Sequence, residues 1–220
     1  MSYIPQLNLS FIHIPKTGGS SFNSELRDRK LEQFNIGHLT MSEIISGQCK
    51  FRQGDILKPI NDPFERRGDV GFGGWPKDIK IAQSLILDSY KISLVRNPYN
   101  RARSAYAFLI SDGTISPDLS FQEFLSDMRG YANGRPLVRS QTEFLFVEGK
   151  LAIDEVLKFE DFPQNIVNLV NTRSSVAGES FGIAQHIHNT RSKKINLNQE
   201  MKEHIYKIYR DDFENFGYSK

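Results

Sequence analysis

Features that would direct a chain to a particular compartment are scarce in this sequence of 220 residues. Its single cysteine, Cys49, excludes an internal disulfide, so folding does not require an oxidising compartment. No apolar run reaches the roughly 18 residues that span a bilayer. Met1 is not followed by the basic and then apolar stretch of a secretion signal. These absences predict a soluble, cytoplasmic protein without a membrane partner.

Net charge is also small. The chain has 28 lysines and arginines against 26 aspartates and glutamates, and the basic residues form no stripe. Nucleic-acid-binding proteins generally have a stronger basic bias, so we expect no nucleic-acid partner. Hydrophobic and charged contents of 39% and 25% are ordinary for a globular protein, and the length favours one domain over residues 1–220. Nothing in the sequence indicates an oligomeric state.

The most informative stretch follows an apolar strand at residues 9–14. It reads Pro-Lys-Thr-Gly-Gly-Ser-Ser, residues 15–21. A helix that begins at such glycines leaves backbone N–H groups unpaired, with the positive end of the helix dipole behind them. A full charge comes from Lys16, and hydroxyl donors come from Thr17, Ser20 and Ser21. Residues 15–21 are therefore predicted to bind a phosphate-like anion; we call them the first anion site.

A second anion site, Arg96 with Ser104, is predicted after the strand 91–95. Asn97 is a plausible helix cap and Pro98 suits the first helical position, so a helix should run to about residue 110. If the two strands are neighbours in a parallel sheet, Arg96 and Ser104 lie beside the first site. An arginine before a helix can also be an ordinary cap or ion-pair partner. Two such sites in one chain make ligand binding the more specific interpretation.

Strands and helices alternate along the chain. We expect helices at about 18–30, from 40 to 45, and from 199 to 215, and a strand at 155–159; residues 141–147 are ambiguous between helix and strand. This alternation predicts an α/β fold with a parallel central sheet flanked by helices.

In the common nucleoside-triphosphate loop the lysine follows the glycines, whereas Lys16 precedes them. Residues 15–21 resemble instead the 5′-phosphosulfate loop of sulfotransferases that use 3′-phosphoadenosine 5′-phosphosulfate (PAPS), in particular carbohydrate sulfotransferases such as heparan sulfate 2-O-sulfotransferase. Residues 94–104, Leu-Val-Arg-Asn-Pro-Tyr-Asn-Arg-Ala-Arg-Ser, resemble the 3′-phosphate motif of that family at the arginine and the serine. Further similarity lies in the segments 38–40, 158–160 and 209–218. Asn100 departs from the aspartate that is frequent in the family.

The resemblance implies a P-loop-like nucleotide-binding sulfotransferase fold, PAPS as sulfuryl donor, and a carbohydrate or small-molecule hydroxyl as acceptor. It assigns Lys16 to the bridging oxygen and 5′-phosphate, and Arg96 and Ser104 to the 3′-phosphate. The phosphosulfate would be bound by Thr17, Gly18, Gly19, Ser20 and Ser21. A late basic loop with Arg191 and Lys193 is similar to the family segment that closes over the nucleotide. No metal site is expected, because the histidines form no ligand set with cysteines.

His38 is the preferred catalytic base, because an imidazole titrates near neutral pH and the histidine of the family lies between the two nucleotide motifs. Competing bases are Glu43 and Asp55, whereas His13 is expected to pack within its strand. Trp75, in the glycine-rich stretch 47–76, is either part of an acceptor-binding lid or a pinned side chain in a surface loop.

Two other functions stay open at this point. One is a nucleotide kinase-like phosphotransferase, although no acidic magnesium ligand stands at a strand end. The other is a non-catalytic nucleotide-binding module. The acceptor is not identified by the sequence.

Overall fold

The computed structural model describes residues 1–28, 34–35, 38–47, 65–66, 74–75, 79–173 and 195–220. Within these ranges five strands form one sheet in the order β3-β1-β2-β6-β9. Strands β2, β6 and β9 are parallel, and β1 and β3 add antiparallel at one edge. The strand bounds are β1 Ser2–Ile4, β2 Leu9–Ile12, β3 Phe34–Asn35, β6 Tyr90–Val95 and β9 Glu155–Lys158. The predicted parallel sheet flanked by helices is confirmed.

The antiparallel edge was not predicted. Strands β1 and β2 are joined only by the 3₁₀ turn Pro5–Leu7 and by Asn8, which adopts the left-handed region with φ 43°. This connection is too short for the crossover that parallel neighbours require. A tight turn therefore reverses the chain and pairs Tyr3 with Ser10.

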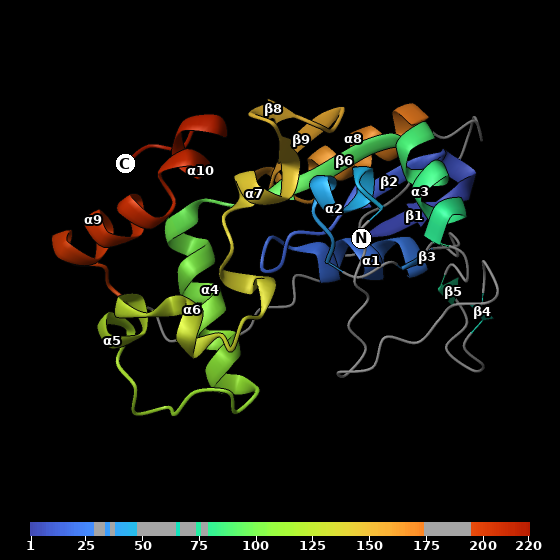
Figure 1. Cartoon of the computed structure of the whole chain (residues 1–220). Coiled ribbons are helices and arrows are strands. Elements are labelled where there is room, and N and C mark those ends of the chain that lie inside the picture. The colour runs from blue at the N-terminus through green and yellow to red at the C-terminus, as the bar shows by residue number, and fades with distance from the viewer. Residues whose placement is uncertain (29–33, 36–37, 48–64, 67–73, 76–78, 174–194) are drawn as a thin grey trace.

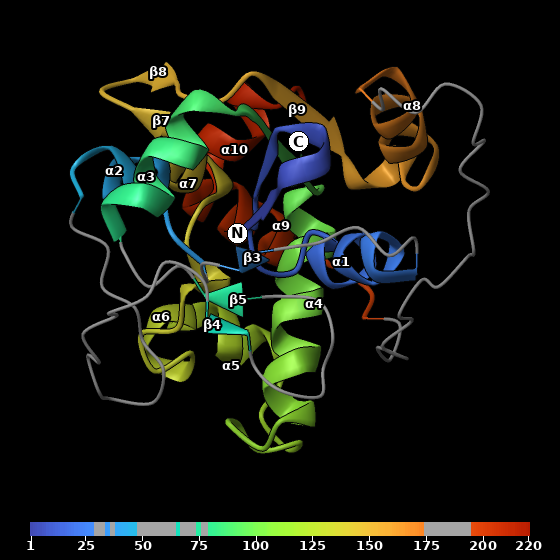
Figure 2. The same cartoon turned by 90° about the vertical axis from the view of Figure 1, so that its right-hand side faces the viewer.

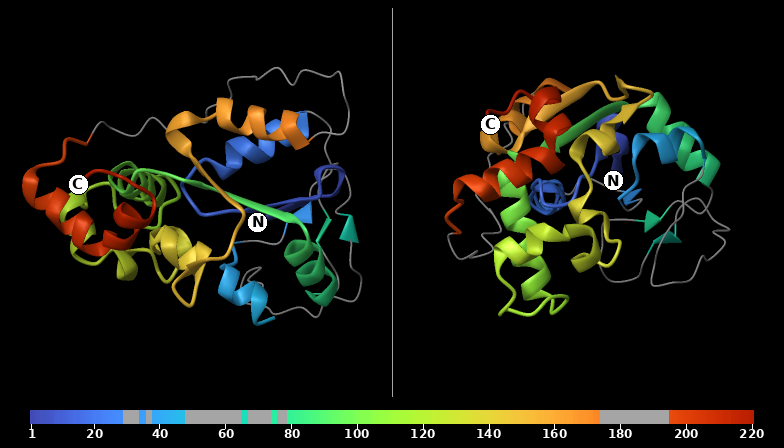
Figure 3. Two further views of the ribbon diagram at one scale, coloured as in Figure 1. Left: turned by 90° about the horizontal axis from the view of Figure 1, so that it is seen from above. Right: turned by 60° about the vertical axis from the view of Figure 1, so that its left-hand side comes forward.

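Alternate side chains of the sheet enter two different cores. Leu9 and Phe11 of β2 pack with helices α1 (Gly19–Asp28) and α8 (Gln164–Arg173). Ile12, at the next position, packs instead with α2 (Met41–Ile45) and α3 (Ile79–Asp88). The view from above shows these two pairs of helices on opposite faces of the sheet (Figure 3, left). Figure 2 shows the same arrangement from the side. The period of two along each strand thus produces a three-layer arrangement.

A third core lies beyond one end of the sheet, where the long helix α4 meets shorter helices (Figure 1). The predicted start of α4 is confirmed, because the Asn97 side chain accepts from the N–H groups of Tyr99 and Asn100 and Pro98 occupies the first turn. The helices that share this core are α4 Pro98–Ser111, α5 Phe121–Ser126, α6 Met128–Tyr131, α9 Gln199–Ile208 and α10 Arg210–Asn215.

The prediction of a single helix over 199–215 is wrong. The chain forms two helices, α9 and α10, which are separated at Tyr209, where φ is −114° and ψ is 29°. The hydroxyl of Tyr209 donates to Val138 O at 2.9 Å. Three residues later, Asp212 accepts from the backbone N–H of Gln141 at 2.8 Å. Both side chains therefore bind the same neighbouring segment, and these tertiary bonds accompany a bend that the apolar spacing did not reveal.

The ambiguous residues 141–147 are helix and then strand. Helix α7 covers Gln141–Leu145 and runs into β7, Phe146–Val147, which pairs with β8, Lys150–Leu151. A further pair is β4, Glu65–Arg66, with β5, Gly74–Trp75; most of the stretch 47–76 lies outside the described residues. No helix in the described ranges combines the length and apolarity needed to cross a membrane.

Candidate anion-binding site

The loop after β2 has the geometry of an anion site. Lys16 has a left-handed backbone with φ 69°, and Gly18 has φ 96°. The N–H of Phe22 donates to Gly18 O at 3.1 Å, so α1 begins its hydrogen bonding there. The three preceding N–H groups then have no partner within the helix. They belong to Gly19, Ser20 and Ser21, and they open at the positive end of α1.

Close packing explains both glycines. A Cβ atom on Gly19 would lie 2.1 Å from the His13 ring, and one on Gly18 would lie 2.5 Å from the Phe159 ring. Neither position has room for a side chain, and the positive φ of Gly18 adds a conformational reason. The loop is therefore held between one ring at the end of β2 and another at the end of β9.

The hydroxyl residues of the loop differ in their setting. Thr17 is fully buried and its hydroxyl donates to Ile14 O at 2.8 Å, so this hydroxyl is already used within the protein. Ser20 is exposed, whereas Ser21 is buried. Phe22 is also fully buried, and its ring centroid lies 4.3 Å from that of Phe11, so it belongs to the core.

The structure brings the two sites together. Strands β2 and β6 are parallel neighbours, and the Nη1 of Arg96 donates to Lys16 O at 3.3 Å. The Lys16 ammonium lies 4.2 Å from the Phe108 ring centroid, on the outer part of α4. Burial lowers the pKa of Lys16, and repulsion from Arg96 adds to this against a weaker attraction from Asp112. Two cations thus stand side by side at the carboxyl edge of the sheet.

Arg96 has a partly buried setting of its own. Its guanidinium lies 4.5 Å from the Phe159 ring centroid. Burial lowers the pKa of Arg96, while the attraction of Glu160 opposes that shift. In the described part of the chain neither Arg96 nor Lys16 has a carboxylate within ion-pair distance. An anionic ligand would supply the missing counter-charge.

Ser104 lies on α4 one helical turn before Phe108 and is half-buried. Residues four apart on a helix share a face, so Ser104 lies on the side that carries Phe108 and, above it, the Lys16 ammonium. Ser104 therefore lies on the face of α4 that the Lys16 ammonium contacts.

His38 lies beside the loop, between β3 and α2, and is exposed. Its Nδ1 is 3.0 Å from His13 O, and the two imidazole centroids are 4.4 Å apart. A carbonyl only accepts, so Nδ1 carries the hydrogen and Nε2 of the neutral ring keeps a free lone pair. Packing around the ring lowers the pKa of His38, as does the α-amino group of Met1, against the bond to His13 O. The ring is therefore suited to accept a proton at neutral pH.

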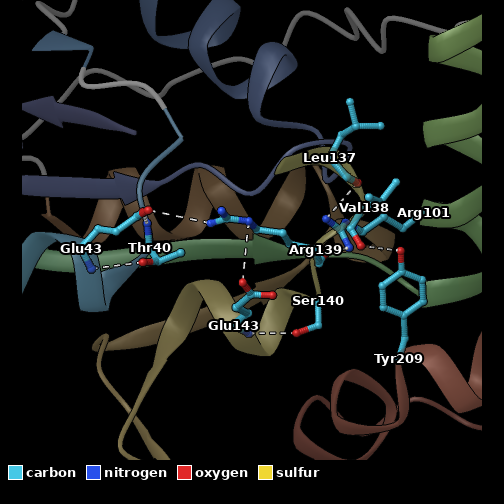
Figure 4. Close-up of polar contacts among 9 residues, drawn as sticks. All are labelled: Thr40, Glu43, Arg101, Leu137, Val138, Arg139, Ser140, Glu143 and Tyr209. Carbon is cyan, nitrogen blue, oxygen red and sulfur yellow. Dashed lines mark hydrogen bonds and ion pairs between the residues drawn. The ribbon is translucent and has the colours of Figure 1, made fainter. Parts of the chain in front are cut away.

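The other candidate bases are placed differently. His13 is half-buried with its ring against Gly19, and burial holds its pKa well below the usual value. Glu43 accepts from Thr40 N at 2.7 Å in the capping box of α2, and it lies 3.8 Å from Arg139 (Figure 4). Asp55, Arg191 and Lys193 lie outside the described residues.

Sequence reasoning missed several side chains that shape the site. Phe108 was detectable, because it follows Ser104 by one turn on the same helix face. Phe159 and the buried Arg101 and Gln141 contact the two sites through tertiary bonds that no spacing in the sequence indicates.

Cavities in the described ranges lie among the helices beyond the end of the sheet. A cavity of about 580 Å³ lies between α5–α6 and α9–α10 and contains none of the site residues. Another, of about 400 Å³, adjoins the start of α4 at Asn97, Asn100 and Arg103. No three histidine, cysteine or acidic side chains of the described part come together as metal ligands.

Fold and site together define an α/β protein with two adjacent candidate anion sites at the carboxyl ends of neighbouring parallel strands. The fold is similar to that of a sulfotransferase from Alicyclobacillus acidocaldarius, whose crystal structure aligns with a TM-score of 0.50 and 18% sequence identity. The alignment covers 94% of this chain and 92% of that one. No family model and no curated protein sequence matches the chain. The expected sulfotransferase-type fold is confirmed by this likeness.

Proposed function

We propose that this protein is a sulfotransferase that uses PAPS and transfers its sulfuryl group to a hydroxyl of a carbohydrate or small-molecule acceptor. One observation carries the proposal: Arg96 lies against the loop of Lys16, with Nη1 3.3 Å from Lys16 O. Two anion sites at this spacing suit a ligand with a phosphate group at each end of one nucleoside. A triphosphate bound at one loop would leave the second site without a role.

The residues present fit such a donor. The N–H groups at the start of α1 and the Lys16 ammonium would bind the 5′-phosphosulfate, and Arg96 with Ser104 would bind the 3′-phosphate. Arg191 and Lys193 stay proposed as nucleotide contacts from the resemblance. PAPS supplies an activated sulfuryl group, whose bond to the 5′-phosphate oxygen breaks as the bond to the acceptor oxygen forms.

Two side chains have proposed chemical roles. Lys16 neutralises the charge that develops on the departing phosphate oxygen, and its lowered pKa makes the ammonium a stronger hydrogen-bond donor. His38 takes the proton of the acceptor hydroxyl at Nε2, while Nδ1 stays bonded to His13 O and fixes the ring. The products are a sulfate ester, adenosine 3′,5′-bisphosphate and a proton.

Thermal unfolding with two ligands tests the nucleotide assignment. We expect adenosine 3′,5′-bisphosphate to raise the melting temperature and ATP with Mg²⁺ to do so much less, because a ligand stabilises the state that binds it. The opposite order would favour a kinase-like phosphotransferase. Incubation of labelled PAPS with panels of glycans and small alcohols then tests catalysis, and tight binding without transfer to any acceptor would favour a non-catalytic module.

A further inference from the structure

Residues 137–142, which lead into α7, are bound along their backbone by buried side chains from other elements (Figure 4). The guanidinium of Arg101 donates to the first and third carbonyls of this segment, at 3.3 and 2.7 Å. The hydroxyl of Tyr209 donates to the carbonyl between them at 2.9 Å. These three acceptors belong to Leu137, Arg139 and Val138. The path of the segment is thus determined by α4 and by the α9–α10 junction.

One end of this arrangement reaches the first anion site. The Nε of Arg101 donates to Pro15 O at 3.1 Å, directly before Lys16. Arg101 is 2% exposed, and burial lowers its pKa against the attraction of Tyr209 and Asp212. One buried guanidinium therefore joins segment 137–142 to the loop of the first site.

The other end reaches the second site. The side-chain amide of Gln141 accepts from Arg96 N at 2.8 Å through Oε1 and donates to Arg96 O at 2.9 Å through Nε2. Arg96 follows the last residue of β6, where the strand ladder has ended. The glutamine amide thus satisfies both backbone groups of Arg96 in place of a neighbouring strand.

Gln141 is itself held in place. The Asp212 carboxylate accepts from the N–H groups of Gln141 and Thr142, both at 2.8 Å, and from the Thr142 hydroxyl at 3.0 Å. Both Gln141 and Asp212 are fully buried. A buried amide whose oxygen and nitrogen are both bonded has few alternative positions, so it transmits the placement of α10 to Arg96.

We propose that Gln141 is a positioning residue that sets the Arg96 guanidinium at the right distance from the Lys16 loop for both phosphates of one nucleotide to bind. The inference rests on the proposed function, because it needs a ligand that occupies both sites. Segment 137–142 contacts Pro15 at one end through Arg101 and Arg96 at the other through Gln141, which makes it a spacer between the sites.

Calorimetric titration with two ligands tests this. Adenosine 3′,5′-bisphosphate needs both sites, whereas adenosine 5′-monophosphate needs only the first. In Gln141→Leu we expect about tenfold weaker binding of the bisphosphate, because Arg96 loses both bonds that fix its backbone and its guanidinium is no longer held in place for the ligand, and less than about a twofold change for the monophosphate. The matched control is Gln164→Leu on α8, an exposed glutamine, which should keep both affinities.

The outcomes separate the two proposals. A wild-type protein that does not prefer the bisphosphate overturns the proposed function. A wild-type preference that survives unchanged in Gln141→Leu, or an equal loss for both ligands, overturns the positioning role alone. If Gln141→Leu does not fold, Gln141→Asn replaces it: its amide is one methylene shorter and cannot reach both backbone groups of Arg96, so the same ratio of affinities decides.

Discussion

Packing of protein atoms around the charged group lowers the pKa of two basic side chains at the site, Lys16 and His38, with different consequences. The lowered pKa of Lys16 makes its ammonium a stronger hydrogen-bond donor beside Arg96. The lowered pKa of His38 favours the neutral ring, in which Nδ1 donates to His13 O and Nε2 carries the lone pair. The same physical cause thus supports an electrostatic role in one residue and a basic role in the other.

We predict that Lys16→Ala lowers turnover more than it lowers nucleotide affinity. The ammonium is proposed to act where charge develops, and removal of one such group typically costs about 10²- to 10³-fold in kcat. Single-turnover rates and calorimetric affinities should be compared with those of Lys150→Ala, an exposed lysine of β8. Weaker binding with an unchanged rate would assign Lys16 a purely anchoring role.

For His38→Ala we predict a loss of about 10²- to 10⁴-fold in kcat, in the range of general-base catalysis. The wild-type kcat/KM should rise with pH and level off below about 6.5, because the His38 pKa lies under the usual histidine value. The variant should lack this rise. His204→Ala, on the exposed side of α9, serves as control. A variant that keeps the rise would direct the search to another base.

At the scale of elements, capping residues explain which helices were predictable. Thr40 and Glu43 form a reciprocal capping box at α2, and Ser120 with Glu123 does so at α5. Such signals are local, so the sequence contains them in full. The break at Tyr209 depends on bonds to residues 137–142, which are distant in the chain, and no local pattern could predict it.

Thr40, the N-cap of α2, lies two residues after His38. Its contribution to the stability of the fold can be measured by substitution. We predict that Thr40→Ala lowers the free energy of unfolding by about 1 kcal/mol, since the Glu43 N–H loses its acceptor at 3.1 Å. Chemical denaturation would measure the change. Thr40→Ser keeps the hydroxyl and should cost less; an equal loss in both variants would show that packing of the methyl group, not capping, is responsible.

At the scale of the whole molecule, strand pairing decides whether two motifs form one site. The parallel pairing of β2 with β6 places the two strand ends next to each other, and Arg101 and Gln141 connect both to segment 137–142. The antiparallel strands β1 and β3 do not separate β2 from β6, because they pair on the opposite edge of β2.

The whole molecule should lose stability in mild acid. The folded-state pKa values of His13 and His38 lie below about 6.5, the usual value in an unfolded chain. Between those values the unfolded chain binds more protons, so stability is complete above pH 6.5 and falls as pH drops through this window. Urea unfolding at pH 7.5 and 5.5 would measure the fall.

His13→Gln should show a smaller difference between the two pH values, because it removes a group that resists protonation in the folded state. His204→Gln should keep the wild-type difference, since its exposed side chain lies away from the loop. An unchanged difference in His13→Gln would mean that other groups cause the acid sensitivity.

The sequence by itself determined the α/β alternation, the cap of α4 and the two candidate anion sites, because strand periodicity, proline at a helix start and glycine in a tight loop act over a few residues. Only the tertiary structure decided that the sites are adjacent, that Nδ1 of His38 is bonded to His13 O, and that Arg101 and Gln141 link the sites. Those features depend on contacts between residues far apart in the chain, which form only when the sheet and its surrounding helices pack.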